Sequence, residues 1–507
     1  MIKKASLLLA FLAITISCTA KQSSTSEEYT LVTYNVENLF DADGAAIYDD
    51  YNTTDDNGDD LYTRQDVLTK VKNAVRVLKA YNRGKGPDIA VIVELESDYT
   101  PVGRNAEKLS YSEFLTKYSS TTLYQMLGAD FNAEIADLPS EFLLLKGMVD
   151  AGMWNYELVT GDSPKDKKGL PTTVQKTAVF SRFPVVAEKT KIHPLYRARP
   201  ILETWINING SELAVFANHW KSGASSAEME DIRVQNAKVL RARLDELVKQ
   251  NEFVDFVLAG DFNSDYNQKE RYGFSPSAVN DVLRSGGDEI GFIEKDGKEV
   301  YNLWYEIPVD QRGSDTYRGY WGTLMQLIVS KGMYDNRGVI YVDNSLERGD
   351  FGFNTFSSSG EPKRWSSTFS GSGYSDHLPV SMKIKIGTGE NSSISPKLVE
   401  HGEWQEIPVA YKMPSEFLTD TEFNEADPTK RPEFYDVYFY LTATVTGQYD
   451  FVVNGRTYDV YTPSFRLNEV LSDIKGTDKE IQFYGRFSQY RGNWQFIVES
   501  PEFLIIK

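Results

Sequence analysis

Apolar runs of strand length restrict the fold of this chain more than any other feature. Three of them, at residues 89–93, 213–217 and 254–259, are dominated by Val, Ile, Leu, Phe and Ala. Such runs are typical of strands that are buried on both faces. Apolar residues at helical spacing precede the first run, within residues 64–80, and lie between the other two, within residues 227–250. Alternation of buried strands with helices predicts the α/β class.

Polar side chains stand at the ends of these runs and of two others. The segments are YNVEN (34–38), VELE (93–96), NHWKS (218–222), GDFN (260–263) and YSDHLP (374–379). Two of the four histidines of the protein, His219 and His377, lie in them. In α/β sheets, sites form beyond the carboxyl ends of strands. Carboxylate and amide oxygens there suit Mg²⁺ or Mn²⁺.

Each segment alone has an ordinary structural explanation. Asn35 can cap a strand end, Glu94 can be a solvated loop acid, and GDFN can be a turn. A single histidine such as His219 is more often a structural hydrogen-bonding residue than a catalytic one. The order and spacing of all the segments together favour a functional site.

In that order, the motifs YNVENLFD, NHWKSG, LAGDFNSD and GYSDHLPV resemble the endonuclease/exonuclease/phosphatase superfamily. The resemblance covers residues 30 to about 387. It implies a four-layer α/β sandwich of two packed mixed sheets. It also implies hydrolysis of phosphate esters with a divalent metal, Mg²⁺ or Mn²⁺, as cofactor.

The resemblance also implies roles for individual residues. The implied metal ligands are Glu94, as the main one, Asn35 and Asp376, and the implied catalytic residues are His219, Asp261, Asn263, Asp376 and His377. The implied phosphate contacts are Asn35, Arg199 and Lys221. For Arg199 and Lys221, an ordinary surface role is an equal alternative.

One position departs from the family pattern. The family strand before the last motif carries an aspartate that orients the final histidine, whereas Met325 stands there in this chain. Methionine neither accepts the imidazole proton strongly nor stabilises imidazolium. If no other acid replaces it, we expect slow catalysis, an activity optimum shifted to lower pH and a faster Met325→Asp variant. If another acid already serves His377, the same substitution should lower the rate. The first outcome is favoured, because residues 321–330 contain no acid.

The N-terminus indicates export. Lys3 and Lys4 precede a short apolar run that ends before Cys18, the only cysteine. A run of this length is too short for a membrane-spanning helix and is typical of a signal peptide. The cysteine resembles the acylated first residue of a bacterial lipoprotein; a plain signal peptide is the alternative. We therefore expect a signal peptide at 1–17, a polar tether at 18–29, and lipid anchoring at Cys18 to a bacterial outer membrane, on its periplasmic or outer side.

The C-terminal part of the chain differs from the rest in amino-acid composition. A Gly/Ser-rich linker at 388–399 follows the predicted catalytic domain, 30–387, and precedes residues 400–507. These residues are rich in aromatic and β-branched residues with turn signals between them, which predicts a small β domain. The stretches YLTATVTGQYDF and IQFYGRFSQYRGNWQFIV resemble strands of an OB-type barrel.

Charge limits the substrate. The 73 acids and 54 bases give a net charge of −19, so phosphate is repelled unless a metal or a local basic patch intervenes. A secreted nuclease or phosphodiesterase, monomeric and acting on nucleic acid, is the leading hypothesis. A phosphatase or phospholipase-like enzyme acting on sugar, inositol or lipid phosphates is an alternative. A catalytically weakened binding protein is another.

Overall fold

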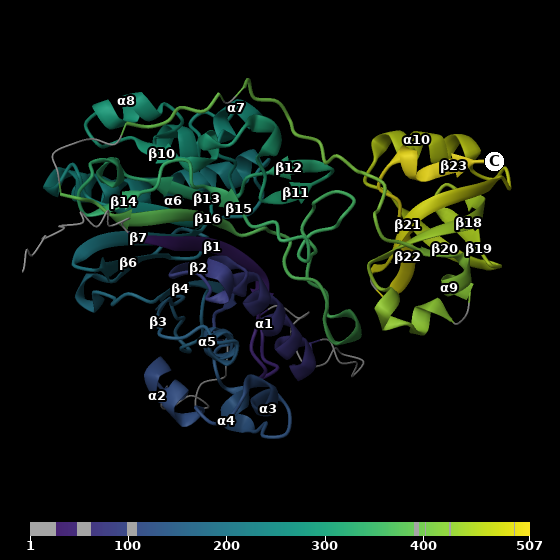
Figure 1. Ribbon diagram of the computed structural model, residues 1–507, viewed down its shortest axis with the longest axis horizontal. Coiled ribbons are helices and arrows are strands. Elements are labelled where there is room, and N and C mark those ends of the chain that lie inside the picture. Colours follow the sequence, from purple (N-terminus) through teal and green to yellow (C-terminus); the bar gives the residue numbers. More distant parts are fainter. Residues whose placement is uncertain are drawn as a thin grey trace, which may run out of the picture.

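Two mixed β-sheets packed face to face form the larger part of the molecule (Figure 1). The computed structural model describes residues 27–47, 62–98, 109–389, 395–400, 402–424, 427–490 and 492–507. The first sheet contains β1 (Glu28–Leu39), β2 (Ile89–Glu96), β3 (Glu157–Gly161), β4 (Gln175–Ser181), β14 (Val339–Tyr341), β15 (Glu347–Arg348) and β16 (Val380–Ile386). Its order is β14-β16-β1-β2-β4-β3, with β15 beside β16.

The second sheet has the order β5-β6-β7-β8-β13-β10-β9. Its strands are β5 (Lys191–His193), β6 (Ile201–Ile208), β7 (Ser211–His219), β8 (Phe256–Asp261), β9 (Ser285–Gly286), β10 (Val300–Asn302) and β13 (Met325–Val329). A separate hairpin joins β11 (Asp315–Tyr317) to β12 (Tyr320–Gly322). In each sheet a parallel pair lies near the centre, β1 with β2 and β7 with β8.

Helices cover the outer faces of both sheets. The helices are α1 (Arg64–Lys79), α2 (Tyr111–Lys117), α3 (Leu123–Leu127), α4 (Ala133–Ala136), α5 (Ser140–Asp150), α6 (Ala227–Gln250), α7 (Gln268–Tyr272) and α8 (Glu289–Glu294). One buried cluster joins α1 and α5 to the first sheet, and another joins α6 to the second. A third cluster fills the space between the sheets. The layers are therefore helix, sheet, sheet, helix, as the resemblance implied.

The strands and helices expected in this region are confirmed with small shifts. α1 begins at a capping box in which Thr63 and Asp66 bond each other's backbone, which fixes its start. The four inward residues expected for α6 are buried: Ile232, Leu240, Leu244 and Leu247. β1 begins at Glu28, where it pairs with Lys385, so the last residues assigned to the tether belong to the sheet.

The C-terminal residues form a third sheet with its own core, separate from the first two. Its elements are β17 (Leu418–Thr419), α9 (Asp420–Asn424), β18 (Val437–Gly447), β19 (Asp450–Val453), β20 (Arg456–Tyr461), α10 (Phe465–Ile474), β21 (Glu480–Tyr490), β22 (Asn493–Ile497) and β23 (Leu504–Ile506). The pairing runs β18-β19-β20-β22-β21, and β21 pairs again with β18. Hydrogen bonds thus close a ring of strands, which we call the C-terminal ring.

The segment before the C-terminal ring packs on the first domain, although the sequence assigned it to the second. Val409 is buried against Trp321 and Leu378. The backbone N–H of Trp321 donates to the carbonyl of Ile407 at 2.9 Å. Hydrophobic contact therefore holds the segment around Val409 beside Leu378, the neighbour of His377, while Tyr411 also packs on the core of the C-terminal ring.

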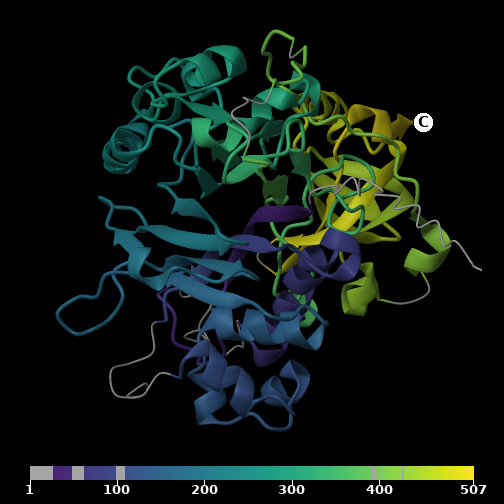
Figure 2. The same ribbon diagram turned by 60° about the vertical axis from the view of Figure 1, so that its left-hand side comes forward.

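The C-terminal ring itself contacts residues 356–369 of the first domain. The Arg486 guanidinium lies 3.9 Å from the centre of the Phe356 ring, and the Phe369 ring lies 5.6 Å from that of Trp494. Tyr438 shares a hydrogen bond with Ser358. Figure 1 and Figure 2 show the C-terminal ring against one end of the sandwich.

The predicted signal peptide and Cys18 lie outside the described residues. Among the helices that are described, none is both long and apolar enough to cross a membrane.

Candidate active site

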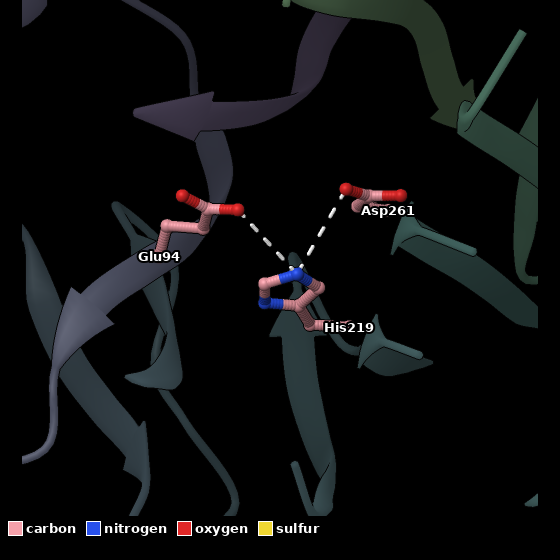
Figure 3. A group of neighbouring side chains, drawn as sticks. All are labelled: Glu94, His219 and Asp261. Carbon is pink, nitrogen blue, oxygen red and sulfur yellow. Dashed lines mark ion pairs between the residues drawn. The ribbon is translucent and has the colours of Figure 1, made fainter. Parts of the chain in front are cut away.

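The carboxyl ends of the central strands of both sheets meet at one edge of the sandwich. In this edge Glu94 comes from β2, His219 from the end of β7 and Asp261 from the end of β8. Figure 3 shows these side chains pointing toward one another. The parallel pairing of His219 with Asp261 sets their common level. The apolar strands thus bring together residues that are far apart in sequence.

His219 lies between two carboxylates. Its Nε2 is 3.6 Å from Glu94 Oε1 and 3.8 Å from Asp261 Oδ2. Asn35 donates from Nδ2 to both acids, at 3.0 Å to Glu94 and 3.2 Å to Asp261. Asn35, His219 and Asp261 are almost fully buried. Four of the predicted residues therefore form one group, in which Asn35 bonds both carboxylates and His219 lies between them.

Backbone strain accompanies this arrangement. Glu94 has φ 66° and Asn263 has φ 47°, in the left-handed region that residues with a Cβ rarely adopt. Glu94 stands where the pairing of β2 with its neighbour shifts by one residue between Val93 and Leu95. The irregularity turns the Glu94 carboxylate into the site, and strain of this kind concentrates at functional sites.

The last motif completes the group from the start of β16. His377 Nε2 lies 3.8 Å from Asp261 Oδ2 and 3.7 Å from Asp376 Oδ1. Ser375 ties the motif to β1, because its hydroxyl donates to the Asn35 carbonyl at 2.7 Å and accepts the His377 N–H at 3.1 Å. Nδ1 of His377 is buried and has no hydrogen-bond partner. This orphaned nitrogen agrees with methionine in place of the family aspartate.

The two histidines have opposite protonation preferences. Burial, together with the charges of Arg199 and His377, lowers the pKa of His219 well below its usual value. Burial alone would lower the pKa of His377 too. Carboxylates outweigh burial there and raise that pKa to about 9; they belong to Asp376, Asp261, Asp315 and Glu94. A neutral and a protonated imidazole therefore face the same carboxylate.

Arg199 joins the site, whereas Lys221 does not reach it through any described side-chain contact. Arg199 donates to the Trp220 carbonyl at 3.2 Å and to Gln175, and its charge opposes the rise in the pKa of Glu94. Lys221 enters the described network by its backbone carbonyl, which accepts from Arg233. Asn263 holds the Trp220 carbonyl with its amide group at 3.1 Å. Arg199 therefore lies close enough to the site for its charge to act on Glu94, and its contact with substrate stays a prediction.

Two basic residues near the site were missed from the sequence. Lys70 of α1 is buried, has no hydrogen-bond partner at Nζ and lies 4.5 Å from the Trp365 ring centre. Burial lowers the pKa of Lys70 to about 7, although Glu37, Glu94 and Asp376 oppose this. Arg364 bridges Glu37 at 3.2 Å and Asp376 at 3.5 Å. The sequence could have indicated Lys70 as a buried residue, because it stands three residues after Val67 on the apolar face of α1.

The central group fits a divalent metal that prefers oxygen. Glu94, His219 and Asp261 each offer one ligand atom, and these atoms all lie within 4.8 Å of one another. Burial raises the pKa of both Glu94 and Asp261, which is the behaviour of carboxylates with too little positive charge around them. Asp376 pairs with Arg364 and does not belong to this group of three. The ligand set expected from the sequence, Glu94, Asn35 and Asp376, therefore stays a prediction.

Comparison with known proteins agrees with the motifs. Residues 143–386 match the sequence model of the Endonuclease/Exonuclease/phosphatase family. None of the curated proteins matches the chain.

Several solved structures are similar at low identity. A family protein from Bacteroides thetaiotaomicron is 14% identical, with 72% of this chain and 98% of that chain covered and a TM-score of 0.38. One from Leptotrichia buccalis is also 14% identical, with 71% and 100% covered and a TM-score of 0.36. Sphingomyelinase C from Streptomyces griseocarneus is 14% identical, with 71% and 99% covered and a TM-score of 0.35.

Proposed function

We propose that this protein is a metal-dependent phosphodiesterase that cleaves nucleic acid, and the match of residues 143–386 to the model of the Endonuclease/Exonuclease/phosphatase family supports the proposal. The observation that carries the proposal is the pair of histidines on Asp261. His219 and His377 each place Nε2 at 3.8 Å from Asp261 Oδ2, with pKa values displaced in opposite directions. Titratable groups driven apart in this way are typical of acid–base sites.

The residues divide the work as follows. Asp261 orients the attacking water and accepts its proton, and Asn35 holds the Asp261 carboxylate in place. Protonated His377 and Arg199 supply positive charge toward the phosphate oxygens. His219 and Asn263 hydrogen-bond the phosphate or the leaving group. A Mg²⁺ or Mn²⁺ ion held by Glu94 would supply further positive charge against the phosphate.

The mature chain without its predicted lipid anchor, residues 19–507, tests the proposal. We expect Mg²⁺ or Mn²⁺ to support cleavage of plasmid DNA, RNA or a generic phosphodiester, and EDTA to abolish it. Glu94→Gln should lower the rate by about 10²-fold or more while the protein stays folded, because it removes charge from a site and not volume from a core. Glu294→Gln, an exposed glutamate on α8, is the matched control. Full activity of Glu94→Gln in chelator contradicts the metal role, and activity on phosphomonoesters alone contradicts the phosphodiester assignment.

The C-terminal ring supports nucleic acid as the substrate class. We propose that it is an OB-like barrel, and its closed strand order and the helix between β20 and β21 support this. An open cavity on it is lined by Lys430, Arg456 and Trp494, among others. Aromatic and basic side chains in one groove suit a single strand. Asp459 lines the same cavity, and Arg456 pairs with Asp427 at 2.8 Å, so a phosphate would have to compete for this arginine.

We also propose that the mature protein is held at a bacterial membrane by lipid on Cys18. The support is the sequence alone: a basic start, a short apolar run and a single cysteine after it. In cell fractionation, the wild type should remain with membranes and Cys18→Ala should appear in the soluble fraction. Membrane retention of Cys18→Ala contradicts the anchor.

A further inference from the structure

Three carboxylates that come from different elements lie close together outside the active site. Glu289 begins α8, Glu306 ends the short helix Leu303–Glu306 after β10, and Asp343 follows β14. Each offers one oxygen, and these oxygens lie within 4.8 Å of one another. Figure 1 shows α8, β10 and β14 on the side of the sandwich away from the C-terminal ring.

Glu289 and Glu306 are buried and Asp343 is partly buried, and no basic side chain of the described residues forms an ion pair with them. Glu289 is 5% exposed and Glu306 is 7% exposed. Tyrosines, and no basic residues, contact these two: Tyr334 donates to Glu289 at 2.9 Å, and Tyr341 donates to Glu306. Among the ion pairs of the described residues, none includes Glu289, Glu306 or Asp343. Burying several carboxylates without positive charge is strongly unfavourable.

Unsatisfied oxygens are a second observation, separate from the clustering. Glu306 Oε1 and Asp343 Oδ1 are inaccessible to solvent and accept no hydrogen bond. Buried polar atoms in native proteins nearly always have a partner, so two orphaned oxygens in one cluster indicate a missing ligand. Burial raises the pKa of Glu289 to about 7 and that of Glu306 to about 8, which agrees with a deficit of positive charge.

We propose that Glu289, Glu306 and Asp343 form a structural Ca²⁺ site. All the donors are oxygens, which excludes the nitrogen and sulfur sets that zinc prefers. Two oxygens that each lie about 2.4 Å from one Ca²⁺ ion can be up to about 4.8 Å apart, so the carboxylates need little movement to bind it. Mg²⁺ demands shorter distances and a stricter octahedron, and it retains water, which a buried cluster disfavours.

The position of the site gives the ion a structural role. β14 is the edge strand of the first sheet, while β9 and β10 form the edge of the second. Asp343 Oδ2 also accepts the backbone N–H of Lys397 at 2.8 Å, and Asn344 donates to the Lys397 carbonyl at 2.9 Å. A Ca²⁺ ion here ties the edges of both sheets to the linker that leads to the C-terminal ring.

Thermal unfolding of the mature chain with the substitution Glu94→Gln tests the site. This substitution removes the carboxylate that would hold a metal in the active site, so that an effect of Ca²⁺ comes from the second site. After chelation and dialysis, added Ca²⁺ should raise the Tm by about 5 °C when it is well above its dissociation constant. Mg²⁺ at the same concentration should raise it by less. Adding Glu306→Gln or Glu289→Gln should remove the Ca²⁺ shift, and adding Glu294→Gln, on the exposed face of α8, should retain it.

Terbium luminescence gives a readout that does not depend on stability. Tb³⁺ binds Ca²⁺ sites and is excited by nearby aromatic rings, and Tyr334 and Tyr341 contact the cluster. We expect sensitised emission that Ca²⁺ displaces, and at least a tenfold weaker affinity in Glu306→Gln. Circular dichroism checks that each variant is folded; if Glu306→Gln is not, Glu289→Gln replaces it. Absence of both the Tm shift and the emission, or their persistence in the folded variants, overturns the proposal.

Discussion

Single residues in the active site are held in conformations that the free chain would avoid. Glu94 and Asn263 have left-handed backbones, and Nδ1 of both His219 and His377 is buried without a hydrogen-bond partner. Each of these features costs stability, of the order of 1–3 kcal/mol for a strained backbone or an unsatisfied buried group. The packed strands around the site maintain this arrangement. The protonation states of His219 and His377 report on this arrangement.

The histidine titrations should differ widely in metal-free protein. We expect the ring of His377 to titrate at about pH 9, because carboxylates surround it, and His219 to remain neutral well below pH 6.5, because it is buried. Proton NMR in chelator can follow both, since the protein has only four histidines and His→Gln variants assign them. A His377 midpoint near 6.5 would contradict the carboxylate environment described above.

Met325→Asp should harm the protein and bring no gain in activity. From the sequence alone, the missing aspartate predicted a weak His377 and a faster Met325→Asp variant. In the structure Met325 is fully buried between the sheets and directly opposite Asp261, and other acids already face His377. A second carboxylate there should lower the Tm by several degrees and reduce the rate. The pH–rate profiles of both proteins, with His377→Ala as the baseline, would refute this if Met325→Asp were faster and active to higher pH.

At the scale of elements, the strands were predictable and the connections were not. Apolar runs locate β2, β7 and β8, because a strand buried on both faces needs apolar residues throughout. The polar residues at their ends then locate Glu94, His219 and Asp261. No local pattern marks Arg364, which reaches the site from a long loop, or the contact of Val409 with Leu378. Such contacts depend on the three-dimensional path of the chain.

The pairing of β7 with β8 allows a direct test of this positioning. Gly260 has φ +135°, and a Cβ there would lie 2.0 Å from the Asn218 carbonyl oxygen of β7. Gly260→Ala should separate the strands that carry His219 and Asp261, at a cost of about 3 kcal/mol or more in unfolding free energy, with loss of activity. Gly273→Ala is the control, because φ is +70° there and nothing lies within 4 Å.

The control should lose only about 1–2 kcal/mol, from the left-handed backbone alone, and should retain activity. Denaturant unfolding and a phosphodiester assay measure both effects. Equal losses in the two variants would show that the close approach of β7 to β8 is unimportant.

At the scale of the whole molecule, the C-terminal ring and the active site share a segment of chain. Residues 356–369 contact the ring through Phe356 and Phe369. The same stretch carries Arg364, at the mouth of the active site, and Trp365, whose N–H donates to Glu37 at 2.6 Å. One loop therefore contacts both the C-terminal ring and the residues around the active site.

Basic residues on the C-terminal ring should matter for long substrates only. We expect the double variant Lys430→Gln, Arg456→Gln to cut plasmid or single-stranded DNA several-fold more slowly, with a weaker dependence on salt, because two phosphate contacts are lost. Its activity on a small phosphodiester should be unchanged. Lys475→Gln, an exposed lysine after α10, is the control. Equal loss on both substrates, or on neither, would contradict a role of the ring in nucleic-acid binding.

The first strand of the catalytic domain lies between the second and the last, and this order affects biosynthesis. β1 pairs with β2 on one side and with β16 on the other, so Asn35 meets His377 only when β16 is in place. A nascent polypeptide therefore has no complete catalytic centre until translation has passed residue 386. Closing so long a loop is also slow, since its conformational entropy must be lost before the contacts form. The catalytic residues of the sandwich thus come together only late in synthesis, after the ribosome has made β16.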